Sequence, residues 1–364
     1  MCVADAISEN PEGAISGDSC VRLNENPTHM KHSASIAATM PQGQDLPLCD
    51  FAKKDQKWDK HRGDTQSIGE VYALDGKYAR LSSRLSLCAN ILEFGELCDK
   101  DTGELSLKLQ NALFCKVRTC PVCSWRRAMR NVARFFERIP TVLDAYPKHA
   151  WLFLTLTVKN PDMCDLRSTL AAMNKAFQRM QQRKDFPAAG YIRTTEITKG
   201  KDGTPHPHFH CLLLVKPGYF QGGVYLSQEA WADMWRECLR IEYQPVVDIR
   251  RVKAESDKAK AAELLEGKIA GLKAAVLETL KYSIKVEDML SDAQFLYGVT
   301  DQLRGLRFLA TGGILKDFLK DEVADDEMVN TGSEDEPTAT PADTPIVLFS
   351  WRTNDRKYRK VNKT

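Results

Sequence analysis

The strongest constraint on the fold is a run of histidines that opens an apolar stretch. Residues 206–210 read His-Pro-His-Phe-His, and residues 211–215 read Cys-Leu-Leu-Leu-Val. Successive side chains of a β-strand point to opposite faces, so His208 and His210 share one face and Phe209 lies on the other. Two imidazoles on one face supply half of a metal site, and burying them without a partner is costly. The pair by itself fits either a metal site or a solvated strand, so the neighbouring segments must decide.

The segment before the histidines predicts the partner strand of a hairpin. Residues 191–198 read as a strand, and the loop that follows contains an Asp-Gly turn signal. A hairpin that is symmetric about Asp202 sets Glu196 opposite His208. Register slips of two residues keep Glu196 on the face of both histidines, whereas a slip of one would scatter them.

Glu196, His208 and His210 are therefore expected to form an open three-ligand site with room for water and a phosphate oxygen. Imidazole and carboxylate ligands suit Mn²⁺ or Mg²⁺ acting as a Lewis acid in phosphoryl transfer, and Zn²⁺ fits the same ligand set equally well. His206 precedes a proline at the start of the strand. We expect it to support the ligands or to be structural.

The surrounding segments predict an α+β fold with the order β-α-β-β-α-β, followed by one more helix. The expected elements are a strand at 150–158, a helix at 166–180, the two hairpin strands, a helix capped by Ser227, a strand at 246–252 and a long helix at about 257–288. This order matches a ferredoxin-like split βαβ arrangement, one antiparallel sheet with helices on one face. Residues 346–351 predict a terminal strand that docks back.

Composition divides the chain into five segments. They are a flexible N-terminal region (1–47), a basic region with a cysteine cluster (48–144), a domain of alternating strands and helices (145–315), an acidic linker (316–345) and a C-terminal strand with a basic tail (346–364). Residues 321–344 hold nine acidic residues and neither Lys nor Arg, so the rest of the chain is distinctly basic. A basic body suits a polyanionic partner, although a solvated surface with an acidic linker has the same composition.

The chain contains no apolar run of the roughly 18 residues that would span a bilayer, and no signal pattern opens it. We therefore expect a cytoplasmic protein without a membrane partner. Its eleven cysteines are an odd number, which favours metal binding or free thiols over a disulfide framework.

A cysteine cluster predicts a structural zinc site. Cys115, Cys120 and Cys123 have the spacing of a Cys-x4-Cys-x2-Cys knuckle, which directs its sulfurs at one ion. A closed tetrahedral site needs a fourth ligand, for which Cys88 is the first choice and Cys98 the second. Redox chemistry at the Cys-x2-Cys pair is the alternative.

Arginines surround the knuckle and are candidates for contact with DNA phosphates. They are Arg118, Arg126, Arg127, Arg130 and Arg134. On a helix, Arg127, Arg130 and Arg134 would share one face. Phosphate contacts would make DNA binding sensitive to salt, although a solvated basic face would look the same.

The long helix offers a nucleophile. Glu278 and Tyr282 are four residues apart, as are Lys281 and Lys285, so each pair would share a helical face. A phenol needs a nearby cation or metal to attack a phosphate efficiently, and the two lysines flank Tyr282. Lys281 and Lys285 are also candidates for DNA contact. An isolated tyrosine is usually structural, so this assignment depends on its context.

Three motifs occur in order: Phe-Leu-Thr-Leu-Thr at 153–157, the histidine strand, and Lys-Tyr-x-x-Lys at 281–285. Together they resemble HUH endonucleases, in particular the single-tyrosine replication initiators of rolling-circle plasmids, over about residues 50–310. The resemblance implies that Tyr282 nicks one strand of origin DNA in an extruded hairpin or melted site. It also implies a covalent 5′-phosphotyrosine and a 3′-hydroxyl primer, with His208 and His210 as metal ligands.

The same resemblance implies a role for Glu278 in termination, where it activates water in place of a second tyrosine. An early cysteine of the family corresponds to Cys88. No Gly-x-x-x-x-Gly-Lys-Ser/Thr loop is present, so unwinding would fall to a host helicase and synthesis to a host polymerase, in a bacterial cytoplasm.

Two kinds of alternative remain at this stage. One is another HUH enzyme, a relaxase or a transposase, against which the zinc knuckle and the Glu-x-x-x-Tyr pair argue. The other is a zinc-dependent DNA-binding regulator without catalysis, in which the histidine strand is structural.

Overall fold

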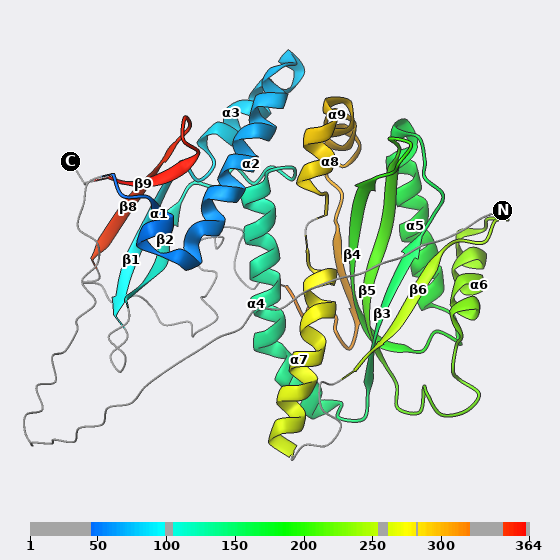
Figure 1. Ribbon diagram of the computed structural model, residues 1–364. Helices are drawn as coiled ribbons and strands as arrows, with labels where there is room; N and C mark the ends of the chain where they lie inside the picture. Colours follow the sequence, from blue (N-terminus) through cyan, green and yellow to red (C-terminus); the bar gives the residue numbers. More distant parts are fainter. Residues whose placement is uncertain (1–44, 99–104, 254–260, 282, 321–344, 362–364) are drawn as a thin grey trace, which may run out of the picture. The chain divides into compact units, whose positions relative to one another are not determined.

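The computed structural model describes residues 45–98, 105–253, 261–281, 283–320 and 345–361 (Figure 1). Three predictions therefore lie outside the described residues. They concern the flexible region 1–47 except for its last three residues, the acidic segment 321–344, and Tyr282.

Within the described ranges the chain forms two antiparallel sheets, the first with strand order β2-β1-β8-β9. The strands are β1 (Ile91–Cys98), β2 (Leu105–Ala112), β8 (Ile346–Arg352) and β9 (Lys357–Val361). The predicted C-terminal strand is confirmed by β8, which pairs with β1. Within the segment predicted as a basic tail, Lys357–Val361 forms a further strand, β9, that pairs with β8. Tyr358 explains this, since its buried ring gives the short strand an apolar face.

Helices pack against this first sheet. They are α1 (Leu48–Phe51), α2 (Gln56–Ala73), α3 (Ala79–Leu87) and α4 (Pro121–Ala145), with the short 3-10 turns η1 (Lys53–Asp55) and η2 (Gly76–Tyr78). Proline at the first position favours the start of α4, because its fixed φ suits a helix and its missing N–H is not needed there. Trp58 of α2 packs edge-on against Trp125 of α4 with ring centres 4.8 Å apart. This contact joins α2 to the helix that follows the cysteines.

The second sheet has strand order β6-β3-β5-β4-β7. Its strands are β3 (Ala150–Thr157), β4 (Ala188–Lys199), β5 (Pro205–Val215), β6 (Val247–Val252) and β7 (Leu309–Gly313). The helices that accompany it are α5 (Leu166–Gln181), α6 (Gln228–Leu239), α7 (Ala261–Thr279), α8 (Val286–Ser291) and α9 (Ala293–Gln302), with the turn η3 (Met163–Asp165). The predicted cap is present, since Ser227 Oγ accepts a hydrogen bond from Ala230 N at 3.2 Å.

Helices cover both faces of the second sheet, so the prediction of helices on one face is wrong. Phe177 of α5 and Trp235 of α6 pack on Phe209 of β5, on one side. On the other side, Leu212 and Leu214 of β5 belong to a core that includes residues of α4 and α7. Figure 1 shows these two helices next to each other. The run of residues 211–215 is continuously apolar because both of its faces are buried.

The long helix predicted at 257–288 is also wrong in extent. Helix α7 ends at Thr279, whose carbonyl accepts a hydrogen bond from the hydroxyl of Thr194 on β4. In a continued helix that carbonyl would accept from the N–H of Ser283. Instead the Ser283 carbonyl accepts from Ile197 N at 2.8 Å, and Ile284 bridges to Ile197. Because β4 holds the chain here in an extended form, Lys281 and Lys285 do not share a helical face.

Candidate metal centres

The β4–β5 hairpin has the register that its sequence predicts. Glu196 pairs directly with His208 across the two strands. The turn is closed by Asp202, whose carboxylate accepts from Thr204 N at 3.1 Å and from Thr204 Oγ1 at 2.6 Å. Gly203 follows with φ of 82°, a left-handed conformation that favours glycine. Local turn chemistry thus fixes which residues face one another.

The hairpin brings Glu196, His208 and His210 together on one buried face. Glu196 Oε2 lies 2.9 Å from His208 Nε2 and 2.8 Å from His210 Nε2. The three side chains offer ligand atoms that all lie within 4.8 Å of one another, and each residue is less than a tenth exposed. A carboxylate and two imidazoles converging in this way could hold a divalent metal ion.

The outward nitrogens of both imidazoles are held by hydrogen bonds. His208 Nδ1 lies 3.2 Å from the carbonyl of His206, and His210 Nδ1 lies 3.2 Å from Thr155 Oγ1 on β3. A carbonyl accepts only, so the proton in this contact is on His208 Nδ1, and Nε2 is the nitrogen that faces Glu196 in the site. Such outer partners orient metal-binding histidines. The sequence analysis did not single out Thr155, although the polar residue in an apolar strand was a signal.

His206 lies outside the group of three. Its Nδ1 is 2.6 Å from Asn160 Oδ1, and burial lowers the pKa of its imidazole. Its carbonyl, rather than its ring, serves the site by accepting from His208.

Two residues at the end of α7 complete the charge arrangement. Lys281 Nζ lies 2.9 Å from Glu196 Oε2 and 2.5 Å from Glu278 Oε1, while Glu278 Oε1 lies 3.6 Å from His210 Nε2. The side chain of Glu278 is 45% exposed, so the site is open on this side. Lys281 is thus bound to the two carboxylates, whereas Lys285 is exposed at the start of α8.

These contacts set the charge of the central carboxylate. Burial alone would raise the pKa of Glu196, but the hydrogen bonds from His208, His210 and Lys281 outweigh it and hold that pKa well below its usual range. Burial also opposes the charge of Lys281, but Glu278 and Glu196 raise the pKa of its ammonium group. The site therefore presents a buried anion with a neighbouring cation.

A second group consists of four buried cysteines. Cys88 follows α3, Cys115 follows β2, and Cys120 and Cys123 begin α4. The sulfurs of Cys88 and Cys123, of Cys115 and Cys123, and of Cys88 and Cys120 are each 3.6 Å apart. Four sulfurs around one zinc at 2.3 Å would be about 3.8 Å apart, whereas a disulfide would need about 2.05 Å. The spacing suits a shared metal ion.

The second-choice ligand Cys98 lies on β1 opposite Leu105, and its side chain is outside the described part of the structure. Hydrogen bonding among the sulfurs, together with burial, raises the pKa of the Cys88 and Cys115 thiols. Four buried thiols ionise together only when a cation balances their charge, so metal binding would release protons.

The knuckle arginines are less exposed than a DNA-binding surface requires. Arg126 lies over the ring of Trp58 at 5.2 Å, and Arg118 lies over Phe308 at 4.1 Å. Arg126 and Arg130 are each less than a tenth exposed, whereas Arg127 is only half-buried. Arg126 and Arg130 are therefore poorly placed for contact with DNA phosphates, whereas Arg118, Arg127 and Arg134 are only half-buried.

No helix of the described ranges is long and apolar enough to cross a membrane.

Comparison with known proteins shows which family this chain belongs to. A model of a family described as "Replication protein" matches residues 106–359. The chain is 33% identical over 336 residues to "Protein rep" of Streptococcus pneumoniae serotype 2, which covers 88% of this chain and 98% of that protein. It is 34% identical over 285 residues to "Protein rep" of Lactiplantibacillus plantarum, with coverage of 74% and 85%. No solved structure gives a significant match.

Proposed function

The chain belongs to this replication protein family of plasmid Rep initiators, and from that premise we propose that it starts rolling-circle replication by nicking one strand of plasmid origin DNA. The observation that carries the proposal is the convergence of Glu196, His208 and His210, with Glu278 at the open side. Family membership argues against the relaxase and transposase alternatives.

The topology supports an HUH nuclease domain. Along the chain the second sheet is built in the order β3-α5-β4-β5-α6-β6, which is the order of a ferredoxin-like split βαβ unit. The histidines lie on its third strand and their carboxylate partner on its second. Helix α7 then ends beside the site, where the chain continues into Lys281 and Tyr282.

The proposed reaction is a transesterification. The oxygen of Tyr282 attacks the scissile phosphorus, a new P–O bond forms to the tyrosine, and the bond to the 3′ oxygen breaks. That oxygen takes up a proton and becomes the 3′-hydroxyl primer. A Mn²⁺ or Mg²⁺ ion held by Glu196, His208 and His210 would polarise the phosphate. Lys281 keeps a positive charge beside the carboxylates, where an attacking phenolate is favoured.

Glu278 is proposed to act at termination. Its carboxylate lies 3.6 Å from His210 Nε2 and is partly open to solvent, so it can take a proton from a water molecule at the site. Water then replaces a second tyrosine as the last nucleophile, and the cycle ends instead of transferring the strand again.

We further propose that the four cysteines hold a structural Zn²⁺. The origin DNA would be presented as a hairpin or melted strand, and a host helicase and polymerase would carry out unwinding and synthesis. Of the basic residues suggested for DNA contact, Lys285 is exposed and Arg118, Arg127 and Arg134 are half-buried, so by exposure these are better placed than the buried Arg126 and Arg130.

The test is nicking of supercoiled plasmid that carries the cognate origin. The Tyr282→Phe chain should bind the origin but form no covalent protein–DNA adduct, and Glu278→Ala should nick but release few monomeric circles. An adduct that persists without the tyrosine hydroxyl would overturn the assignment of the nucleophile. Origin binding without metal-dependent nicking by the unaltered chain would instead support a non-catalytic regulator.

A further inference from the structure

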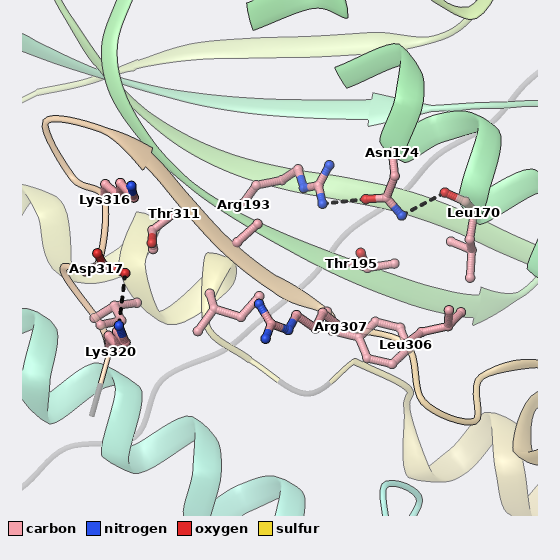
Figure 2. A pocket seen from close by; sticks show the side chains of 14 residues that line it. Leu170, Asn174, Arg193, Thr195, Leu306, Arg307, Thr311, Lys316, Asp317 and Lys320 are labelled. Atoms are coloured by element: carbon pink, nitrogen blue, oxygen red, sulfur yellow. Dashed lines mark hydrogen bonds and ion pairs between the residues drawn. The ribbon is translucent and has the colours of Figure 1, made fainter. Parts of the chain in front are cut away.

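A groove with a basic lining runs along β7, the edge strand of the second sheet (Figure 2). It has a volume of about 740 Å³ and is lined from α5, β4, β7 and the segments that precede and follow β7. Its charged lining residues are Arg193, Arg307, Lys316, Asp317 and Lys320. Four basic groups face one acidic group, so the lining has an excess of positive charge.

Arg193 is the buried charge of this lining, with only 6% of the residue exposed. Its Nη2 donates to Asn174 Oδ1 at 2.6 Å, and its guanidinium lies 4.1 Å from the centre of the Phe209 ring. Its Nε has no hydrogen-bond partner, and none of the carboxylates that the structure describes lies within 4.0 Å of the group. Burial lowers the pKa of this arginine, yet a guanidinium stays protonated in proteins.

A buried cation that has only neutral partners is costly. Asn174 and the aromatic ring reduce this cost but supply no negative charge. An anion bound in the groove would lie beside Arg193 and offset its uncompensated charge. The chemistry of this wall therefore points to an anionic ligand.

The rim of the groove carries further positive charge. Arg307 and Lys316 are exposed and form no ion pair with any residue that the structure describes. Asp317 lies 4.0 Å from Lys320, and both side chains are more than half exposed, so this is a weak pair that offsets one lysine only. The surplus charge at the rim comes from Arg307 and Lys316.

The size and the apolar lining of the groove indicate which kind of anion it could bind. Pockets of about 300–1,000 Å³ hold ligands much larger than a phosphate ion. Leu170, Leu306 and Leu309 give this groove an apolar wall beside the basic groups. A free phosphate would use neither the volume nor the leucines, whereas a nucleotide has a phosphate for the arginines and a sugar and base for the leucines.

We propose that the groove binds a nucleotide of the single DNA strand that is engaged at the nuclease site, with its phosphate at Arg193 and Arg307. Thr195 of the lining is adjacent to Glu196 on β4, and their side chains point to opposite faces of the sheet. The strand would therefore pass around the sheet edge at β7. This inference rests on the proposed function, because it takes single-stranded DNA as the substrate.

The test measures binding without cleavage. Fluorescence anisotropy of the full-length chain with a short labelled oligothymidylate, without added divalent metal, reports strand binding alone. The double variant Arg307→Gln with Lys316→Gln should raise Kd about tenfold and reduce the salt slope by about 1.4, since each lost phosphate contact on a single strand is worth about 0.7. Lys184→Gln, an exposed lysine outside the lining, is the matched control and should bind like the unaltered chain.

Arg193→Lys tests the buried group. The lysine keeps the positive charge but lacks the planar guanidinium group with its several N–H donors. Binding of the oligothymidylate should therefore weaken about fivefold, while the melting temperature stays unchanged. Should this variant fail to fold, the double variant decides, because both of its residues are exposed.

Binding by the double variant that equals the Lys184→Gln control, in both Kd and salt slope, would overturn the proposal. Thymidine 5′-monophosphate that binds as tightly as the oligothymidylate would overturn the strand assignment in favour of a free nucleotide. Failure of the proposed nuclease would appear differently, as strand binding that depends on the groove but no adduct at Tyr282.

Discussion

The two candidate metal centres are built in opposite ways. Glu196, His208 and His210 come from a single hairpin, and their outer side meets the half-exposed Glu278. The four cysteines come from the end of α3, the segment after β2 and the start of α4, and all are buried. Structural zinc sites are closed by four protein ligands, whereas catalytic sites keep an open position. If both groups bind metal as we propose, the closed cysteine group would serve stability and the open hairpin group would serve chemistry.

The two centres are not independent. Thr119, next to Cys120, and Ile284, two residues after Tyr282, line the same small cavity. Ser283 and Ile284 therefore lie between β4 on one side and residues next to the knuckle on the other. Disorder of the knuckle should reach the nuclease, while loss of the hairpin ligands should leave the knuckle intact.

The largest expected effect follows Cys120→Ser. A structural zinc contributes roughly 10–16 kcal/mol of apparent binding energy to folding, so its loss should lower the melting temperature by more than about 10 °C and abolish nicking. Zinc content by atomic absorption should fall from one ion per chain to none. Cys49→Ser, a cysteine of α1 outside the group, is the control and should keep both. Unchanged zinc content in the Cys120 variant would contradict the proposal that Cys120 is a ligand of a structural zinc ion.

His208→Ala should separate chemistry from stability. It removes one ligand of three, so Mn²⁺ affinity by calorimetry should fall more than about 100-fold and nicking about 1,000-fold. The melting temperature should move by only a few degrees, because Glu196 keeps His210 and Lys281 as partners. His206→Ala is the matched control, since its ring lies outside the site and its carbonyl remains. Equal Mn²⁺ binding by the two variants would contradict the ligand assignment.

The hairpin centre was predictable because it is local. The strand periodicity of two and the Asp-Gly turn are enough to set Glu196 opposite His208. The end of α7 was not, because Thr194 captures the carbonyl of Thr279 across 85 residues of chain. The spacing of apolar residues along a helix cannot reveal a hydrogen bond to a residue so distant in the sequence.

The cysteine region shows a different limit of prediction from sequence. The sequence motif pointed to Cys115, Cys120 and Cys123, but only the fold brings the distant Cys88 beside them. Strand β2 was overlooked although leucine alternates with polar residues along Leu105–Ala112, a pattern typical of a half-buried strand. The burial of Arg126 depended on its contact with Trp58, far away in the sequence.

A smaller effect is expected from Thr155→Val. The substitution keeps the side-chain volume but removes the hydroxyl that holds His210 Nδ1. Loss of such an outer partner typically costs about 10–100-fold in metal affinity or activity, and we expect the lower end of this range for Mn²⁺ binding. Thr157→Val is the control, because its hydroxyl donates to the carbonyl of Val246 rather than to a histidine. A loss of the same size in both variants would mean that the strand, not the imidazole, had been disturbed.

The smallest effect concerns the pH response of the cysteine region. Burial raises the pKa of Asp55 to about 6, although Trp58 and Arg126 oppose the shift. A folded pKa above the unfolded value of 3.8 means that the folded state binds more protons in between. The contribution of Asp55 is therefore present in full below pH 3.8 and is lost as the pH rises through 6. Asp55→Asn should raise the melting temperature by about 1–2 °C at pH 7.5 and by less at pH 5.5. The exposed Asp162→Asn should have the same small effect at both pH values, and an equal response of the two variants would show that Asp55 does not titrate in this range.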